Sequence, residues 1–236
     1  MTSTTRPFAL LDIFTTPTSI FNDLVGTKKW SWVALFTLLL AFSVSSYFFY
    51  DGMSAQWIVE QQLIFAGDMS DTQRQSAEIA LQKTVHNTAL IGAVSAPLFQ
   101  LLIVTIFSGY FMLISKTVGT KSVNHYKYSD WFSFTTWTQM PTLVNIIGFI
   151  VLFSTSASPD LPLSLVNYAS LNQIVTEFVQ GDSLYFWAES ISLFYLWSIA
   201  ISAIGLKLCC AMPWSKALLF SLLPYLLIFG LWLLLI

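Results

Sequence analysis

Residues 90–115 read LIGAVSAPLFQLLIVTIFSGYFMLIS and contain no Asp, Glu, Lys, Arg or His. A helix needs about 20 apolar residues to cross the hydrocarbon core of a bilayer, and unpaired backbone groups in lipid force such a run to be helical. The stretch therefore predicts a membrane-spanning helix. Four further runs also lack charged residues and histidine: 32–50, 132–153, 190–206 and 217–236.

The five runs predict an all-α, polytopic membrane protein that folds as a bundle of five transmembrane helices. A composition of 56% hydrophobic and 9% charged residues lies outside the range of soluble domains. We expect one membrane domain over residues 32–236, preceded by an amino-terminal segment, 1–31. The longer connections, 51–88 and 156–186, form two outer segments.

The basic residues are distributed asymmetrically between the two sides of this arrangement. Eight of the ten precede the first run, separate the second from the third, or separate the fourth from the fifth. They are Arg6, Lys28, Lys29, Lys116, Lys121, Lys127, Lys207 and Lys216. By the positive-inside rule, these connections are cytoplasmic. The amino terminus is therefore predicted inside and the carboxyl terminus outside.

The segment ahead of the first run is amphipathic. Thr16 and Pro17 are typical of a helix start and Gly26 of a helix end. Apolar side chains between them share one face beside two lysines, so the helix is predicted to lie along the inner headgroup layer. We interpret this face as a docking surface for a cytoplasmic partner or as an anchor that seats the first span. Its residues are Phe14, Pro17, Ile20, Phe21, Leu24, Lys28 and Lys29.

The pattern Ile13-Phe14-x-x-Pro17-x-x-x-Phe21, followed by five spans with Pro141 inside the third, resembles the Yip-domain family. These small membrane proteins are named for binding Ypt/Rab GTPases, and the resemblance covers nearly the whole chain. It implies five spans with the amino terminus inside, and no catalytic signature. The chain lacks the long polar amino-terminal domain of many eukaryotic relatives. This difference argues against Rab binding and favours a bacterial-type member in the inner (cytoplasmic) membrane.

Polar side chains within the runs are few. Gln100, Gln139 and Asn145 are candidates for an intramembrane polar cluster, although such amides also simply tie helices together. Small residues allow close helix contact, either between spans or between subunits. The candidates for such contacts are Gly92, Ala96, Ser198, Ser202 and Gly205.

Several kinds of chemistry find no support in the sequence. The runs carry no ionisable residue of the sort that proton-coupled and ion-coupled transporters use. No catalytic motif is present, and His86 and His125 are predicted on opposite sides of the membrane. We therefore expect no enzyme, no catalytic or metal site, no cofactor and no nucleic-acid partner. The adjacent Cys209 and Cys210 are predicted to be reduced and packed at a helix end, with acylation or binding of a soft metal as the alternative.

The outer segments are predicted to be partly structured. Ser70 and Gln73 have capping-box spacing, and the apolar residues after them continue at helical spacing toward the second run. Residues 171–178 also show helical spacing. Asp130 and Glu189, at the edges of runs, are expected to reach water, and Trp131 is expected in an interfacial aromatic belt.

These observations predict a non-enzymatic membrane adaptor or scaffold that works through protein contacts. Its expected partners are membrane lipids, a protein of unknown identity and a second copy of the chain. The alternative is a lipid-handling protein, for flipping or transport, with a polar groove near Gln100, Gln139 and Asn145.

Overall fold

The computed structural model describes residues 8–67, 69–118 and 126–236. Arg6, Lys121 and His125 lie outside the described residues. The all-helical prediction is confirmed, since the named elements are helices and one isolated antiparallel bridge joins Ser170 to Ser192. The elements are α1 (Ala9–Thr15), α2 (Pro17–Asn22), α3 (Lys28–Asp51), α4 (Ala55–Phe65), α5 (Asp71–Thr84), η1 (Val85–Asn87), α6 (Thr88–Val118), α7 (Tyr128–Thr138), α8 (Pro141–Ser154), η2 (Leu163–Asn167), η3 (Asn172–Thr176), α9 (Tyr185–Glu189), α10 (Leu193–Cys209) and α11 (Trp214–Leu235).

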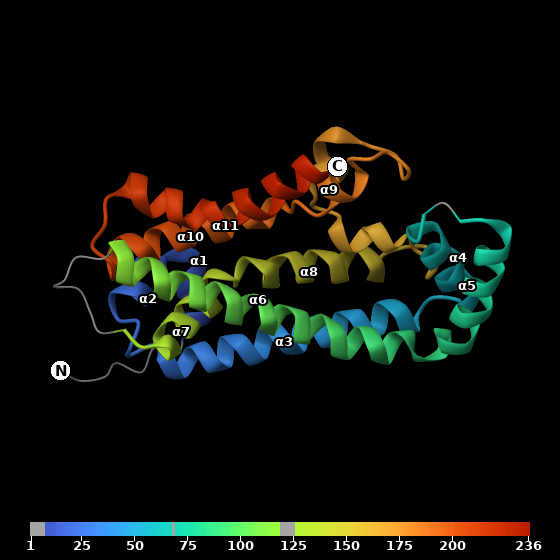
Figure 1. The fold of residues 1–236 in the computed structure, drawn as a ribbon. Helices are drawn as coiled ribbons and strands as arrows, with labels where there is room; N and C mark the ends of the chain where they lie inside the picture. The colour runs from blue at the N-terminus through green and yellow to red at the C-terminus, as the bar shows by residue number, and fades with distance from the viewer. Residues whose placement is uncertain (1–7, 68, 119–125) are drawn as a thin grey trace.

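The long helices lie lengthwise in one elongated bundle, and successive passes run in opposite directions (Figure 1). The passes are α3, α6, α7 with α8, α10 and α11. The short helices α1 and α2 pack at one end, which we call the α2 end. The helices α4 and α5 lie at the other, which we call the α5 end.

Four helical segments are long and apolar enough to cross a membrane: Lys28–Asp51, Asp71–Val118, Tyr128–Ser154 and Trp214–Leu235. The remaining pass, α10, is also apolar but has only 17 residues. Three predicted runs fall within helices of these bounds or extend one residue past them, and the run 190–206 begins three residues before α10. The third run is divided between α7 and α8.

Proline decides where the third pass breaks. Pro141 was expected inside one continuous third span, but the helix is interrupted there, and Pro141 is the first residue of α8. Proline has no N–H for the helical ladder and its ring clashes with the preceding turn. Pro97 and Pro224, in contrast, lie inside continuous helices α6 and α11.

The α5 end is built from the two outer segments. The predicted capping box is present: Ser70 Oγ accepts from Gln73 N, and Gln73 Oε1 accepts from Ser70 N. From there α5 continues through η1 into α6. Asp160 binds the backbone and hydroxyl of Ser54 at 2.7 and 3.0 Å, so the loop before α4 is fixed to the segment after α8.

The helix expected from the spacing at 171–178 forms over most of that stretch. Leu171 is helical, the π-helical turn η3 follows it, and Glu177 ends the turn with φ +50°. The Asn172 side chain accepts hydrogen bonds from Thr176 Oγ1 and Phe178 N. Asparagine side chains that bind nearby backbone compete with helix formation in this way.

Candidate functional site

The α1–α2 hairpin is part of the core at the α2 end. Ala9, Ile13, Ile20, Phe21 and Leu24 are at most 2% exposed. Helix α2 packs mainly on α10, and α1 packs on α2 and α3. These five residues form one inward face, with Ala9 and Ile13 on α1, Ile20 and Phe21 on α2, and Leu24 just after α2. The hairpin is therefore anchored by burial within the protein itself.

Phe21 is the centre of this anchor. Its ring lies 5.1 Å from that of Phe134, measured between centroids, and its carbonyl lies 3.7 Å from Cys209 Sγ. A Cβ added at Gly205 would lie only 2.4 Å from the Phe134 ring and 3.0 Å from the Phe21 ring. Gly205 therefore allows α10 to approach α2 and α7 closely, as expected of a helix-contact residue.

The other predicted contact residues also serve contacts inside the chain. Ser198 and Ser202 are buried on α10, and the Ser202 hydroxyl donates to the Ser198 carbonyl. A Cβ added at Gly92 would lie 2.9 Å from the Tyr50 ring, so α6 meets α3 at this glycine. Ala96 lies one turn further along the same face of α6. Because these faces are covered within the chain, self-association would have to use other surfaces.

The outward side of the hairpin exposes both polar and apolar side chains, and three of the apolar ones are large. Phe8, Leu11 and Val25 are 66%, 62% and 61% exposed. We call these three side chains the hairpin surface. Phe8 and Leu11 were not among the predicted residues of this segment. Their place away from Ala9 and Ile13 on a helical wheel could have indicated that they are exposed.

The remaining members of the predicted docking or anchor face occupy several environments. Phe14 is half-buried, with its ring edge-on to Trp197 at 5.6 Å, and Pro17 is half-buried as the first residue of α2. Lys28 is engaged in an ion pair, and Lys29 is exposed. Together with the buried Ile20, Phe21 and Leu24, these positions favour the anchor interpretation for most of the face.

One ion pair ties the start of α3 to the start of α7. Lys28 Nζ lies 2.7 Å from Asp130 Oδ1 and donates to Ser129 Oγ at the same distance. Asp130 Oδ2 accepts from Lys127 N at 2.9 Å, so the carboxylate also caps α7. The expectation that Asp130 reaches water is wrong, because these donors hold it in a buried position.

The belt position expected for Trp131 is also wrong. Its ring is 1% exposed and packs edge-on to Tyr126 at 5.8 Å. Burial, then the neighbouring Cys209, Cys210 and Asp130, raise the pKa of Tyr126 to about 12. Both cysteines are free thiols and buried, which fits their predicted packing role.

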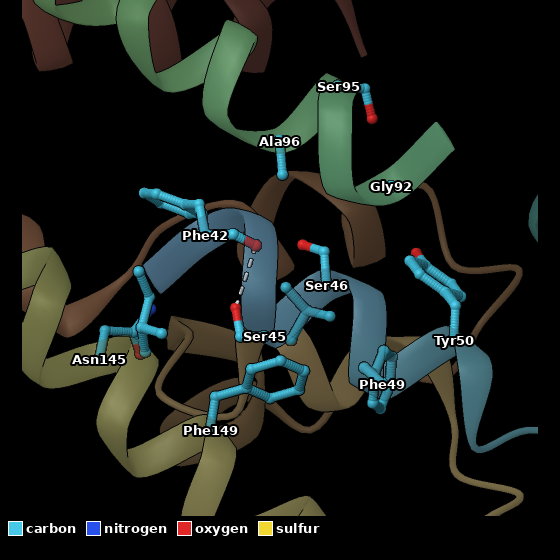
Figure 2. A pocket seen from close by; sticks show the side chains of 12 residues that line it. Phe42, Ser45, Ser46, Phe49, Tyr50, Gly92, Ser95, Ala96, Asn145 and Phe149 are labelled. Carbon is cyan, nitrogen blue, oxygen red and sulfur yellow. Dashed lines mark hydrogen bonds between the residues drawn. The ribbon is translucent and has the colours of Figure 1, made fainter. Parts of the chain in front are cut away.

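A cavity of about 190 Å³ lies between α3, α6 and α8. Figure 2 shows Ser46 and Tyr50 of α3 facing the α6 residues Gly92 and Ala96. Its remaining lining residues are Phe42, Ser45, Phe49, Ser95, Asn145, Ile146, Phe149 and Val166. Ser95 also lines a shallow apolar depression on the outer surface of α6. The cavity therefore lies next to the surface that faces lipid.

The predicted polar cluster is not assembled in this cavity. Of its three members only Asn145 lines the cavity, and Asn145 Oδ1 is a buried oxygen without a protein hydrogen-bond partner in the described structure. Gln100 is buried, also with its Nε2 unpartnered, and Gln139 interacts with the Tyr225 hydroxyl. Gln139 thus ties the break between α7 and α8 to α11.

Within the described ranges, no group of three or more His, Cys, Asp and Glu side chains is placed to hold a metal ion.

Comparison with known proteins identifies one family. The family described as Yip1 domain matches residues 11–236, nearly the whole chain, from α1 to the last residue. No curated protein and no solved structure matches the chain significantly.

Proposed function

We propose that this chain, which belongs to the Yip1-domain family, is a non-enzymatic adaptor or scaffold of the bacterial inner membrane. It is a multi-pass membrane protein with four helical segments of spanning length. In the proposed arrangement α10 is the fourth of five passes. The α2 end then faces the cytoplasm and the carboxyl terminus lies outside.

The charge distribution along the bundle supports this orientation. The basic residues of the passes gather at the α2 end, where Lys207 Nζ lies 4.4 Å above the Trp214 ring. A cation over an aromatic ring is typical of the boundary between membrane and water. Acidic residues lie at the α5 end, among them Asp51, Glu60, Asp71, Glu78 and Asp160.

The observation that carries the adaptor proposal is the two-sided hairpin α1–α2. Its inner face is buried against α10, while the hairpin surface presents three large apolar side chains. Burial of one face fixes the conformation of the other, so a partner would pay little entropy to bind it. Large apolar side chains that stay exposed on a rigid support favour a protein contact.

The test is extraction in a mild amphiphile from the native membrane, followed by native mass spectrometry. The unmodified protein should retain one protein partner in fixed ratio. The Leu11→Asp variant should lose that partner, because an aspartate in the hairpin surface opposes apolar contact. Thr18→Asp, exposed on α2, is the matched control. Absence of any stoichiometric partner from the unmodified protein would refute the proposal.

The cavity between α3, α6 and α8 favours a second function, lipid handling. It combines serine hydroxyls and the unpartnered Asn145 oxygen with three phenylalanines, and it adjoins the lipid-facing surface at Ser95. If the cavity carries lipid, Asn145→Leu should abolish a lipid-flip signal in reconstituted vesicles. Gln100→Leu, which removes a buried amide outside the cavity, should leave it unchanged. No flip signal from the unmodified protein would exclude this function.

A further inference from the structure

Helix α10 is too short to cross a bilayer alone. Its 17 residues span about 25 Å at 1.5 Å per residue, against a hydrocarbon core of about 30 Å. Lys207 and Trp214 mark the boundary with water at the α2 end. The missing length therefore lies at the other end, before Leu193. This step rests on α10 being a membrane pass, as proposed above.

Residues 169–192, which we call the outer loop, fill that position. Leu193 N donates to the Ala169 carbonyl at 2.8 Å, and Leu171 N donates to the Ile191 carbonyl at 2.7 Å. The loop is thus bonded to the first residue of α10. Trp187 Nε1 donates to the Phe229 carbonyl at 2.9 Å, so α9 lies beside the last two turns of α11. In Figure 1, α9 is accordingly seen near the carboxyl terminus.

Part of the backbone of the outer loop is hydrogen-bonded within the protein, as irregular backbone in lipid requires. Irregular backbone is tolerated at membrane depth only where its polar groups find partners inside the protein. Asn172 supplies several: its Oδ1 accepts from Phe178 N at 2.8 Å and its Nδ2 donates to the Phe178 carbonyl at 3.2 Å. Its own carbonyl accepts from Glu177 N at 3.0 Å.

A buried carboxylate fixes the base of the outer loop. Glu189 was expected to reach water, and this is wrong, because the side chain is buried. Its Oε2 accepts from Ser170 Oγ at 2.5 Å and its Oε1 accepts from Gln173 Nε2. Ser170 precedes η3 and Gln173 lies within it, so the carboxylate holds this turn in place.

The loop presents three aliphatic side chains outward, together with exposed polar residues such as Gln173, Glu177 and Asp182. Ile174, Val175 and Val179 are 53%, 66% and 68% exposed, and we call them the loop tip. Beside the loop, the end of α11 continues the apolar surface with exposed Leu231, Leu234 and Leu235. The exposed aliphatic side chains of the loop tip thus lie beside the apolar surface of α11. This position favours membrane lipid as the neighbour of the loop tip.

We propose that the loop tip inserts into the outer leaflet of the protein's own membrane. The outer loop thereby completes the fourth pass that α10 leaves short. Membrane lipid, through its acyl chains, is the ligand of this surface. The inference is independent of any protein partner at the α2 end.

The experiment places one reporter at the loop tip. A cysteine at Val175 is labelled with an environment-sensitive fluorophore, and the protein is reconstituted in vesicles of phosphatidylethanolamine and phosphatidylglycerol. The unmodified protein is treated in parallel, which measures any labelling of the buried Cys209 and Cys210. Thr72→Cys, exposed on α5, is the matched control outside the membrane. Quenching is measured with a nitroxide on the lipid acyl chain and with aqueous iodide.

Insertion predicts that the acyl-chain nitroxide quenches the label at 175 severalfold more than the label at 72, with the opposite order for iodide. Equal access of iodide to both labels would overturn the proposal. Protection of the label at 175 from both quenchers would also overturn it, because a protein surface would then cover the loop tip.

Discussion

Gly205 is the residue on which the packing of the α2 end most depends. It lies where three elements meet, since any larger residue on α10 would enter the space of Phe134 and Phe21. Its role as a contact residue was predictable from the small residues one turn before it. The neighbours were not, because Phe21 and Phe134 come from distant parts of the sequence.

We predict that Gly205→Ala destabilises the protein by about 1–3 kcal/mol, because overpacking a filled site forces neighbours to shift. Thermal unfolding in detergent measures this, and limited proteolysis reports release of the hairpin. Gly109→Ala is the control: nothing lies within 4 Å of its added Cβ, and alanine is the better helix former. Equal effects of the two substitutions would contradict the packing account.

The ion pair of Lys28 with Asp130 gives a second prediction at this scale. Lys28→Met should destabilise the protein by about 1–2 kcal/mol, because it leaves a buried carboxylate with fewer donors. Lys29→Met, at an exposed neighbour, should be nearly neutral in the same unfolding measurement. If the two substitutions changed the stability equally, the ion pair of Lys28 with Asp130 would have no structural role. The partner was not predictable, since it lies 102 positions along the chain.

Elements governed by local sequence were predicted well, and elements governed by distant contacts were not. The capping box at Ser70 needs only two residues three apart, so it is visible in the sequence. The hairpin α1–α2 showed its apolar face equally clearly. Its burial against α10, however, is decided by residues almost two hundred positions away. The turn η3 ends after Thr176, where the Asn172 side chain accepts from the following backbone at Phe178.

Ser70→Ala should remove the amino-terminal cap of α5 at a cost of about 1 kcal/mol of local stability. Hydrogen exchange should then accelerate in the first turn of α5. Ser76→Ala is the control within the same helix, because the Ser76 hydroxyl only supplements a helical carbonyl at Thr72. Unchanged exchange in the Ser70 variant would show that the cap contributes nothing.

The whole molecule is a membrane bundle with two different ends. The apolar runs could be predicted from the sequence, since hydropathy depends on composition alone. Their orientation is a prediction from the distribution of the basic residues. The sequence pattern could not show that α10 is short or that an irregular loop adjoins it. It also could not place Gln100, Gln139 and Asn145, because amides at similar depth face different neighbours in a packed bundle.

Topology is testable by thiol labelling in intact cells. A cysteine at Thr72 should react with a membrane-impermeant reagent added from outside, whereas one at Lys29 should react only after the membrane is opened. Both positions are exposed, so accessibility depends on the side of the membrane. The topology predicts one pass, α3, between the two positions. Reaction of both cysteines from outside would contradict it.

The most direct test of the adaptor proposal is site-specific photocross-linking in the native membrane. A photoreactive side chain at Leu11 or Val25, both in the hairpin surface, should yield one protein adduct of the same added mass. At Leu219, exposed on α11, it should yield none. The account is contradicted if Leu11 and Val25 give no protein adduct, or if Leu219 gives the same one.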